Sequence, residues 1–163
     1  MAKKKLKMPV TAGVRALRAA GAEFSPHLYA YEERGGTSVS SAALGVDEHA
    51  VIKTLVMEDD AGVPLVVLMH GDCEVATGVL AREIGVRKVT PCRPDRAEKH
   101  SGYQVGGTSP FGLRTAMPIY AERTIAQLPL VFINGGKRGF LVSLSPDVLV
   151  AVTGLQWVDA AQP

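Results

Sequence analysis

The sequence has few cysteines, few aromatic residues and little net charge. Its two cysteines, Cys73 and Cys92, are too few and too far apart for a disulfide framework or a paired-cysteine zinc or redox motif. We expect both to be reduced thiols that pack in the interior of a cytosolic protein. A net charge of +2 permits nucleic-acid binding without predicting it, because basic residues can still gather on one face.

Long apolar segments are also lacking. The longest apolar run, residues 63–69, is far shorter than the roughly 18 to 20 residues that cross a bilayer. The lysine-rich start, residues 1–8, is followed by no continuous apolar region or small-residue cleavage site, so it does not read as a secretory signal. The sequence therefore predicts a cytoplasmic protein without a membrane span, whose basic tail could add weak, salt-sensitive attraction to RNA.

The length and composition fit one globular domain. Of the 163 residues, 47% are apolar, which is typical of a chain that buries a core rather than of a disordered one. We expect residues 1–10 to be a basic tail and residues 11–163 to form a single domain.

Capping and turn signals predict a series of short elements. Thr11 and Ser145 are good N-caps, the latter followed by Pro146 at the first helical position. Helices are expected over residues 11–21, 40–44, 75–84, 94–100 and 146–154, with one further turn after Asp47. Strands are expected over residues 24–31, 52–57, 64–69, 86–90, 130–133 and 140–144.

The order of these elements indicates the fold class. Strands outnumber helices, and there is neither an internal repeat nor a regular alternation of strand and helix. The segment 134–137, Asn-Gly-Gly-Lys, is expected to be a hairpin turn because Asn-Gly supplies the positive φ angles that such turns require. The predicted fold is α/β (α+β), with a mixed, mostly antiparallel, barrel-like sheet surrounded by helices.

Lys53 is the residue most in need of an explanation. It stands in the otherwise apolar stretch Val-Ile-Lys-Thr-Leu-Val-Met at 51–57, although lysine is among the residues least often buried. On pattern alone, its ammonium points to solvent or extends out from the start of a strand. The alternative is a cation in a pocket, where it holds a carbonyl or phosphate oxygen or developing negative charge.

Two glycine-rich segments are further candidates. Residues 101–112 contain glycines that let a ligand approach the backbone, so that amide groups form a cradle or oxyanion hole; an ordinary surface loop is the alternative. Residues 134–139 carry Lys137 and Arg138 at a hairpin tip, where they either meet phosphate or are solvated.

No metal site or protein nucleophile is expected. The four histidines, His27, His49, His70 and His100, have no spacing typical of zinc ligands. There is no Gly-x-Ser-x-Gly nucleophile motif, and neither cysteine has a base partner that the sequence reveals. The sequence implies no cofactor.

Four motifs in order, none specific alone, resemble the YbaK/EbsC family of trans-editing domains, which is related to the editing domain of bacterial prolyl-tRNA synthetases. They are Phe-x-x-His-x-Tyr at 24–29, Val-Ile-Lys-Thr-Leu at 51–55, Gly-Tyr-x-Val-Gly-Gly-x-Ser-Pro-x-Gly at 102–112, and Gly-Gly-Lys-Arg-Gly at 135–139. The resemblance covers residues 11–154 and implies a pocket for the aminoacyl end of tRNA.

The resemblance also implies the site residues. Lys53 falls on the family's lysine, and Gly106 on a loop glycine whose backbone faces the aminoacyl ester; these two are the predicted catalytic residues. Asn134 stands where the best-known members often have serine, and a pocket aspartate that some members carry after the hairpin is not found. The predicted substrate-binding residues are Tyr29, Thr54, Gly107, Thr108, Ser109, Asn134, Gly135, Gly136, Lys137 and Arg138.

The loop motif is most similar to that of the Cys-tRNA(Pro) deacylases. In these, the thiol of the substrate attacks the ester carbonyl and leaves as a cyclic thioester, which fits the lack of a protein nucleophile. The alternatives are deacylation of Ala-tRNA(Pro) or another small aminoacyl-tRNA, a non-catalytic module that binds tRNA or a synthetase, and a thiol or sulfur-transfer enzyme. The expected partners are the acceptor end of aminoacyl-tRNA and prolyl-tRNA synthetase; the sequence does not indicate the oligomeric state.

Overall fold

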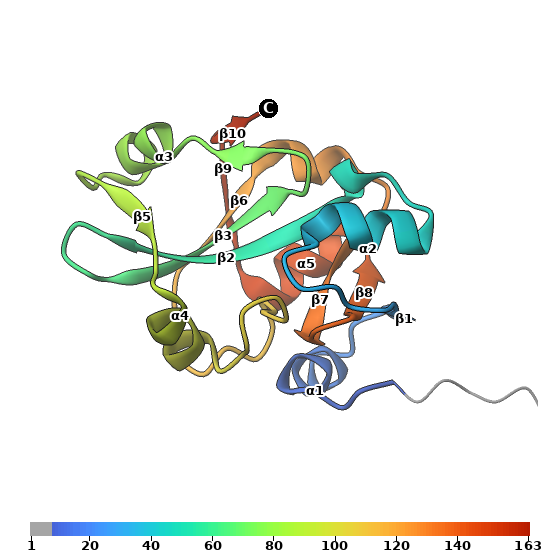
Figure 1. Ribbon diagram of the computed structural model, residues 1–163. Coiled ribbons are helices and arrows are strands. Elements are labelled where there is room, and N and C mark those ends of the chain that lie inside the picture. The colour runs from blue at the N-terminus through green and yellow to red at the C-terminus, as the bar shows by residue number, and fades with distance from the viewer. Residues whose placement is uncertain (1–7) are drawn as a thin grey trace, which may run out of the picture.

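The nine-residue strand β2 (Val51–Asp59) lies at the centre of the main sheet (Figure 1). The computed structural model describes residues 8–163. A tight turn at Gly62 connects β2 to β3 (Pro64–His70), and the two strands pair antiparallel from Ile52–His70 to Glu58–Pro64. Nearly every residue of β3 is buried, which agrees with its position between two layers of packed side chains.

The main sheet has eight strands and mixes both kinds of pairing. Its order is β1-β8-β7-β2-β3-β6-β9, with β5 also paired to β2. Three of its pairings are parallel, β2 with β7, β3 with β6, and β6 with β9, and the others are antiparallel. The remaining strands are β1 (Ser25–Leu28), β5 (Val89–Pro91), β6 (Ile119–Glu122), β7 (Val131–Lys137), β8 (Phe140–Leu144) and β9 (Gln156–Val158), with β4 (Glu74–Val75) and β10 (Ala161–Gln162) forming a separate pair.

Five α-helices and two 3-10 turns, counted over residues 8–163, surround the sheet (Figure 1). As predicted, the hydroxyl of Thr11 accepts from Val14 N, and that of Ser145 accepts from Val148 N. In this part of the chain no helix is long and apolar enough to cross a membrane. The elements are α1 (Ala12–Ala19), α2 (Gly36–Leu44), η1 (Glu48–Ala50), α3 (Thr77–Ile84), α4 (Pro94–Ser101), η2 (Arg123–Gln127) and α5 (Pro146–Thr153).

Apolar side chains form a separate cluster on each side of the sheet. The larger one gathers residues of α1, α5, η2 and the strands around β7, with Leu17, Phe111 and Phe140 fully buried. The smaller one packs α3 and β5 against β2 and β3 through Leu80 and Val67. The predicted fold class, a mixed and mostly antiparallel sheet surrounded by helices, is confirmed.

The predicted hairpin turn at 134–137 is wrong, although the hairpin itself is present. Strand β7 continues to Lys137, which pairs with Phe140, so the turn consists of Arg138 and Gly139. The segment 134–137 instead forms a β-bulge, in which Gly136 has a φ of 112°. Asn134 and Gly135, which were expected to supply positive φ, do not; Gly136 does, and it does so within the strand.

Other element boundaries differ because tertiary pairing decides them. The first predicted strand is limited to β1, and α3 begins at Thr77 because Val75 pairs with the C-terminal strand β10. Helix α2 begins at Gly36, four residues earlier than expected. Strands β6 and β9 were not predicted, because each is short and is paired only with strands distant in sequence, β6 with β3 and β9, and β9 with β6.

Glu122 is a buried carboxylate that connects the end of β6 to the C-terminal segment. Its oxygens accept hydrogen bonds from Thr124 N and Oγ1 at 2.9 and 2.8 Å, and from the amides of Ala160 and Ala161 at 2.9 and 3.0 Å. Burial opposes ionisation, but these hydrogen bonds outweigh it and hold the pKa of Glu122 below its ordinary value of 4.5.

The depressed pKa predicts a loss of stability in acid. Because the native state favours the ionised form, the contribution of Glu122 is complete above about pH 4.5 and is lost as pH falls through the native pKa. We expect Glu122→Gln, which faces an NH₂ group toward donors, to lower the free energy of unfolding by about 2 kcal/mol at pH 7. The deficit should shrink below pH 4.5 in urea unfolding. Glu23→Gln, at an exposed position, is the control; an equal deficit at all pH values would contradict the assignment.

Candidate active site

One edge of β2 is unpaired in its middle. Strand β7 pairs with β2 only at Val51 and Ile52, and β5 pairs with it only at residues 57–59. These partners share one edge, since β3 occupies the other from residue 52 to residue 58. Within the described chain, residues 53–55 therefore have no partner on that edge, and Val56 is held there only by the hydrogen bond from Cys92 N to its carbonyl. All four line a cavity of about 670 Å³.

The cavity walls come from segments far apart in the sequence. Helices α2 and α4 both pack against β2, and the loop between α4 and β6 reaches toward the β7–β8 hairpin (Figure 1). The wall carries three basic side chains, of Arg34, Lys53 and Arg138, and two acidic ones, of Glu32 and Glu33. Such a wall, mostly apolar and with more basic than acidic side chains, suits a ligand with an anionic end.

Lys53 lies at the gap in the sheet. Its side chain is 20% exposed, and its ammonium donates to the carbonyl of Cys73 and lies 3.7 Å from the Glu74 carboxylate. Glu74 is 82% exposed, so this ion pair is weak. The ammonium therefore has one backbone acceptor and one weak ion pair, in a side chain that is largely shielded from solvent.

Thr54 presents a second polar group in the same strand. Its hydroxyl oxygen is buried and has no hydrogen-bond partner among the described residues, while the residue lines the cavity. A buried hydroxyl without a partner costs about 1 to 3 kcal/mol. A group of this kind in a native structure needs an explanation, such as a functional role or a bound water or ion.

The glycine-rich loop brings backbone amides to the cavity. Gly106 has a φ of 89°, and a Cβ there would lie 2.7 Å from the hydroxyl of Tyr31, so the position excludes any side chain. The amide of Gly107 donates to Gln104 O. Within residues 8–163, no hydrogen bond to the amides of Gly106 and Thr108 is found, and both residues line the cavity.

Side chains of the hairpin hold this loop in place. Arg138 Nε donates to Val105 O at 2.9 Å, and Asn134 Nδ2 donates to Gly106 O at 3.3 Å. The other end of Asn134 accepts from the amides of Gly136 and Lys137, at 2.6 and 3.1 Å. Asn134 therefore shapes the bulge and the loop together, a role that serine is too short to fill.

An aromatic wall completes the site, and the sequence prediction included only half of it. Tyr29 was predicted, and burial raises the pKa of its phenol, so the hydroxyl stays protonated at neutral pH. Tyr31 was not predicted; it lines the cavity, and the guanidinium of Arg138 lies 5.0 Å from its ring centroid. Arg34, also missed, has a left-handed φ of 58°, a conformation that costs a non-glycine residue about 1 to 2 kcal/mol.

The structure brings most, but not all, of the predicted site residues to the cavity. The residues that line it are Tyr29, Lys53, Thr54, Gly106, Thr108, Asn134 and Arg138. The others support the wall from behind: a Cβ on Gly107 would lie 2.7 Å from Arg138 N, and the Ser109 hydroxyl accepts from Phe111 N. Gly135 and Gly136 form the bulge, and Lys137 is exposed.

Neither cysteine is an activated nucleophile. Burial, together with the nearby Glu58 carboxylate, raises the pKa of Cys92, which lines the cavity. Burial and the adjacent Asp72 likewise raise the pKa of Cys73. Both thiols are protonated at neutral pH, so neither is poised to act as a nucleophile at this cavity.

A family comparison agrees with this arrangement. The sequence model of the aminoacyl-tRNA editing domain matches residues 33–152, which include Lys53, the glycine-rich loop and the hairpin. The chain belongs to this family. The resemblance to the YbaK/EbsC type, inferred from four short motifs, is confirmed.

Several relatives of this editing domain are known. It is 28% identical over 160 residues to EbsC of Enterococcus faecalis, named as a candidate Cys-tRNA(Pro)/Cys-tRNA(Cys) deacylase, and the match covers 98% of this chain and 97% of EbsC. It is 32% identical over 124 residues to the proline–tRNA ligase of Moorella thermoacetica, covering 74% of this chain but only 21% of the ligase.

A solved structure shares the fold of this editing domain. It is described as a candidate trans-editing enzyme for prolyl-tRNA synthetase and superposes with a TM-score of 0.83 at 24% identity, covering 96% of this chain and 100% of the other. At that identity, the likeness establishes the fold alone.

The bridging role of Asn134 can be tested with two substitutions. Asn134→Ala removes both sets of hydrogen bonds and should lower the free energy of unfolding by about 1 to 3 kcal/mol. Asn134→Asp keeps the acceptor for Gly136 and Lys137 but cannot donate to Gly106 O. Hydrogen exchange should therefore show both bulge amides protected in the aspartate variant and unprotected in the alanine variant. Equal protection in both variants would show that the side chain does not organise the bulge.

Proposed function

We propose that this editing domain hydrolyses mischarged aminoacyl-tRNA, with Cys-tRNA(Pro) as its substrate. The observation that carries the proposal is the meeting of Lys53 and the glycine-rich loop at one cavity, in a chain of the aminoacyl-tRNA editing family. The cation suits the phosphate or ribose end of the acceptor strand, and the backbone amides suit the ester carbonyl.

In the proposed mechanism, the Lys53 ammonium and the amides of the glycine-rich loop contact different parts of the substrate. Lys53 binds an oxygen at the 3′ end of the tRNA and offsets negative charge there, while the amides of Gly106 and Thr108 polarise the ester carbonyl. In both roles the protein positions and stabilises charge; it forms no bond to the substrate.

The nucleophile in this mechanism is the thiol of the substrate cysteine. Its sulfur attacks the ester carbonyl carbon, the bond to the tRNA ribose oxygen breaks, and the thiol proton ends on that oxygen. The products are a cyclic thioester and free tRNA. The protonated state of Cys73 and Cys92 supports a mechanism without a protein nucleophile.

The choice among tRNAs is proposed to depend on a synthetase partner. In this proposal the cavity contacts only the aminoacyl end of the tRNA, and the partner recognises the rest of the tRNA. The similarity to a segment of a proline–tRNA ligase supports prolyl-tRNA synthetase as the partner, in the cytoplasm where charging takes place. Size alone discriminates poorly between small side chains, because one methylene is worth only about 1 to 3 kcal/mol.

The first test combines substrate and residue. Cys-tRNA(Pro), Ala-tRNA(Pro) and Pro-tRNA(Pro) are each incubated with wild type and with Lys53→Met, which keeps the bulk of the side chain and removes the charge. We expect the wild type to remove cysteine fastest and to spare proline, and Lys53→Met to lose about 100-fold or more in rate, a loss typical of removing one electrostatic contact. Lys88→Met, at an exposed position outside the cavity, is the matched control.

Each other outcome selects a different function. A preference for alanyl ester would make the chain an alanine-specific deacylase. Complex formation with tRNA or synthetase without turnover of any ester would identify a binding module. Unchanged hydrolysis of Cys-tRNA(Pro) by Lys53→Met would refute the role of the ammonium.

Thr54 offers an independent test, since its hydroxyl is expected to serve the ligand rather than the fold. Thr54→Val replaces the unpartnered hydroxyl by a methyl group of similar size. The free energy of unfolding should stay equal or rise by up to about 1 kcal/mol, while the deacylation rate falls about tenfold. Thermal unfolding and single-turnover hydrolysis measure the two effects; a variant that is less stable but fully active would contradict the assignment.

A further inference from the structure

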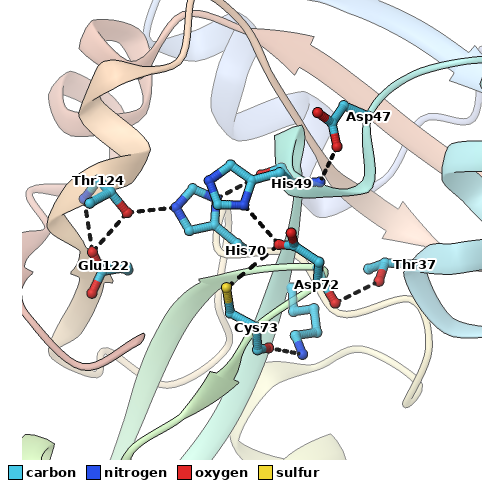
Figure 2. A network of polar contacts seen from close by, with 10 residues as sticks. Thr37, Asp47, His49, His70, Asp72, Cys73, Glu122 and Thr124 are labelled. Carbon is cyan, nitrogen blue, oxygen red and sulfur yellow. Dashed lines mark hydrogen bonds and ion pairs between the residues drawn. The ribbon is translucent and has the colours of Figure 1, made fainter. Parts of the chain in front are cut away.

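Three side chains that are common metal ligands converge outside the cavity (Figure 2). His49 lies in η1, and Asp72 and Cys73 lie in the turn between β3 and β4. Each residue offers one ligand atom, and the three atoms all lie within 4.8 Å of one another. The sequence gave no sign of this cluster, because the histidine and the other two residues are more than twenty positions apart.

Two of the three distances within the cluster can be compared directly with a tetrahedral site, and the third, from His49 to Cys73 Sγ, is within 4.8 Å. Asp72 Oδ1 lies 2.8 Å from His49 Nδ1 and 3.6 Å from Cys73 Sγ. Ligands at about 2.0 to 2.3 Å from a shared zinc ion are about 3.3 to 3.7 Å apart in a tetrahedron. The Asp72–Cys73 spacing already fits, and His49 has to move away from Asp72 by about half an ångström.

The surroundings hold the ligands in position while leaving the site open. His70, which is fully buried, donates from Nδ1 to His49 O and stacks on the His49 ring with centroids 3.6 Å apart. The side chains of His49 and Asp72 are 42% and 46% exposed, whereas Cys73 is buried. An ion can therefore enter from solvent and keep a water molecule in a fourth position.

The backbone of the turn is fixed as well. Thr37 Oγ1 donates to Gly71 O at 3.1 Å, and the Lys53 ammonium donates to Cys73 O. The turn is thus held from α2 on one side and from β2 on the other, so that two of the three ligands have little freedom to disperse. Preorganised ligands of this kind lower the entropy cost of binding.

A hydrolytic triad explains the cluster less well. In such a triad the imidazole faces the nucleophile, but here the carboxylate of Asp72 lies between the ring and the thiol (Figure 2). A mixed set of one nitrogen, one oxygen and one sulfur is also unsuited to Mg²⁺ or Ca²⁺, which take oxygen ligands. It is typical of zinc and of metals that substitute for zinc.

We propose that His49, Asp72 and Cys73 bind one divalent cation of the zinc type, with the fourth position open to water. The site is separate from the proposed deacylation chemistry and does not rest on it. Because Cys73 O also holds the Lys53 ammonium, an ion here would further fix the turn against which that lysine is positioned.

The test uses the untagged full chain after chelator treatment, titrated with Co²⁺ as a spectroscopic substitute for zinc. We expect one equivalent to produce the near-ultraviolet charge-transfer band of a cobalt–thiolate bond together with visible bands of a four-coordinate ion, and Zn²⁺ to displace both. Cys73→Ser should abolish the thiolate band. His49→Gln and Asp72→Asn should weaken binding by about 10- to 100-fold or more, since even partners outside the ligand sphere have effects of that size.

Cys92→Ser is the matched control, because Cys92 faces Glu58 and has no histidine beside it in the described contacts. It should keep the full spectrum. The proposal is overturned if Co²⁺ produces no thiolate band, if Cys73→Ser retains it, or if Cys92→Ser loses it. Should Cys73→Ser fail to fold by circular dichroism, the two variants at exposed positions decide, and unchanged affinity in both refutes the site.

Discussion

The break in pairing along β2 is the constraint on which the site depends. A strand paired on both edges would use the backbone of residues 53–55 in the hydrogen-bond ladder, and another strand would fill the space beside it. Because β7 leaves β2 after Ile52 and β5 joins it only at Met57, this stretch opens to a cavity while the strand stays anchored at both ends. The sheet thereby fixes the backbone of Lys53, while no neighbouring strand fills the space beside it.

The remaining walls are assembled by local departures from regular structure. The bulge at 134–137, the positive φ of Gly106 and the left-handed Arg34 each cost conformational free energy. Thr54 adds a hydroxyl without a partner. These unfavourable features all lie around the cavity. The two apolar clusters on either side of the sheet offset their free-energy cost. This distribution is expected where binding, and not folding, determines the local sequence.

Local signals predicted much of this molecule, and distant contacts account for the rest. Lys53 was found because it is a cation in an otherwise apolar strand, and the loop because it is unusually rich in glycine. Thr11 and Ser145 were predicted as N-caps from their residue types. The turn at 134–137 was misplaced because glycines serve a bulge and a turn equally well. Tyr31 and the His49 cluster were missed because no spacing links them to their partners. The roles predicted for Gly106 and the other site residues remain predictions.

The hairpin of β7 and β8 has a consequence for the order in which the chain can become functional. Strands β2 and β3 are neighbours in sequence and can pair as soon as both leave the ribosome. The hairpin then inserts between β1 and β2, which requires contacts over more than eighty residues and is correspondingly slow. Lys53 therefore lies on a strand that local contacts can form, whereas Asn134 and Arg138 reach the pocket only through contacts between residues distant in sequence.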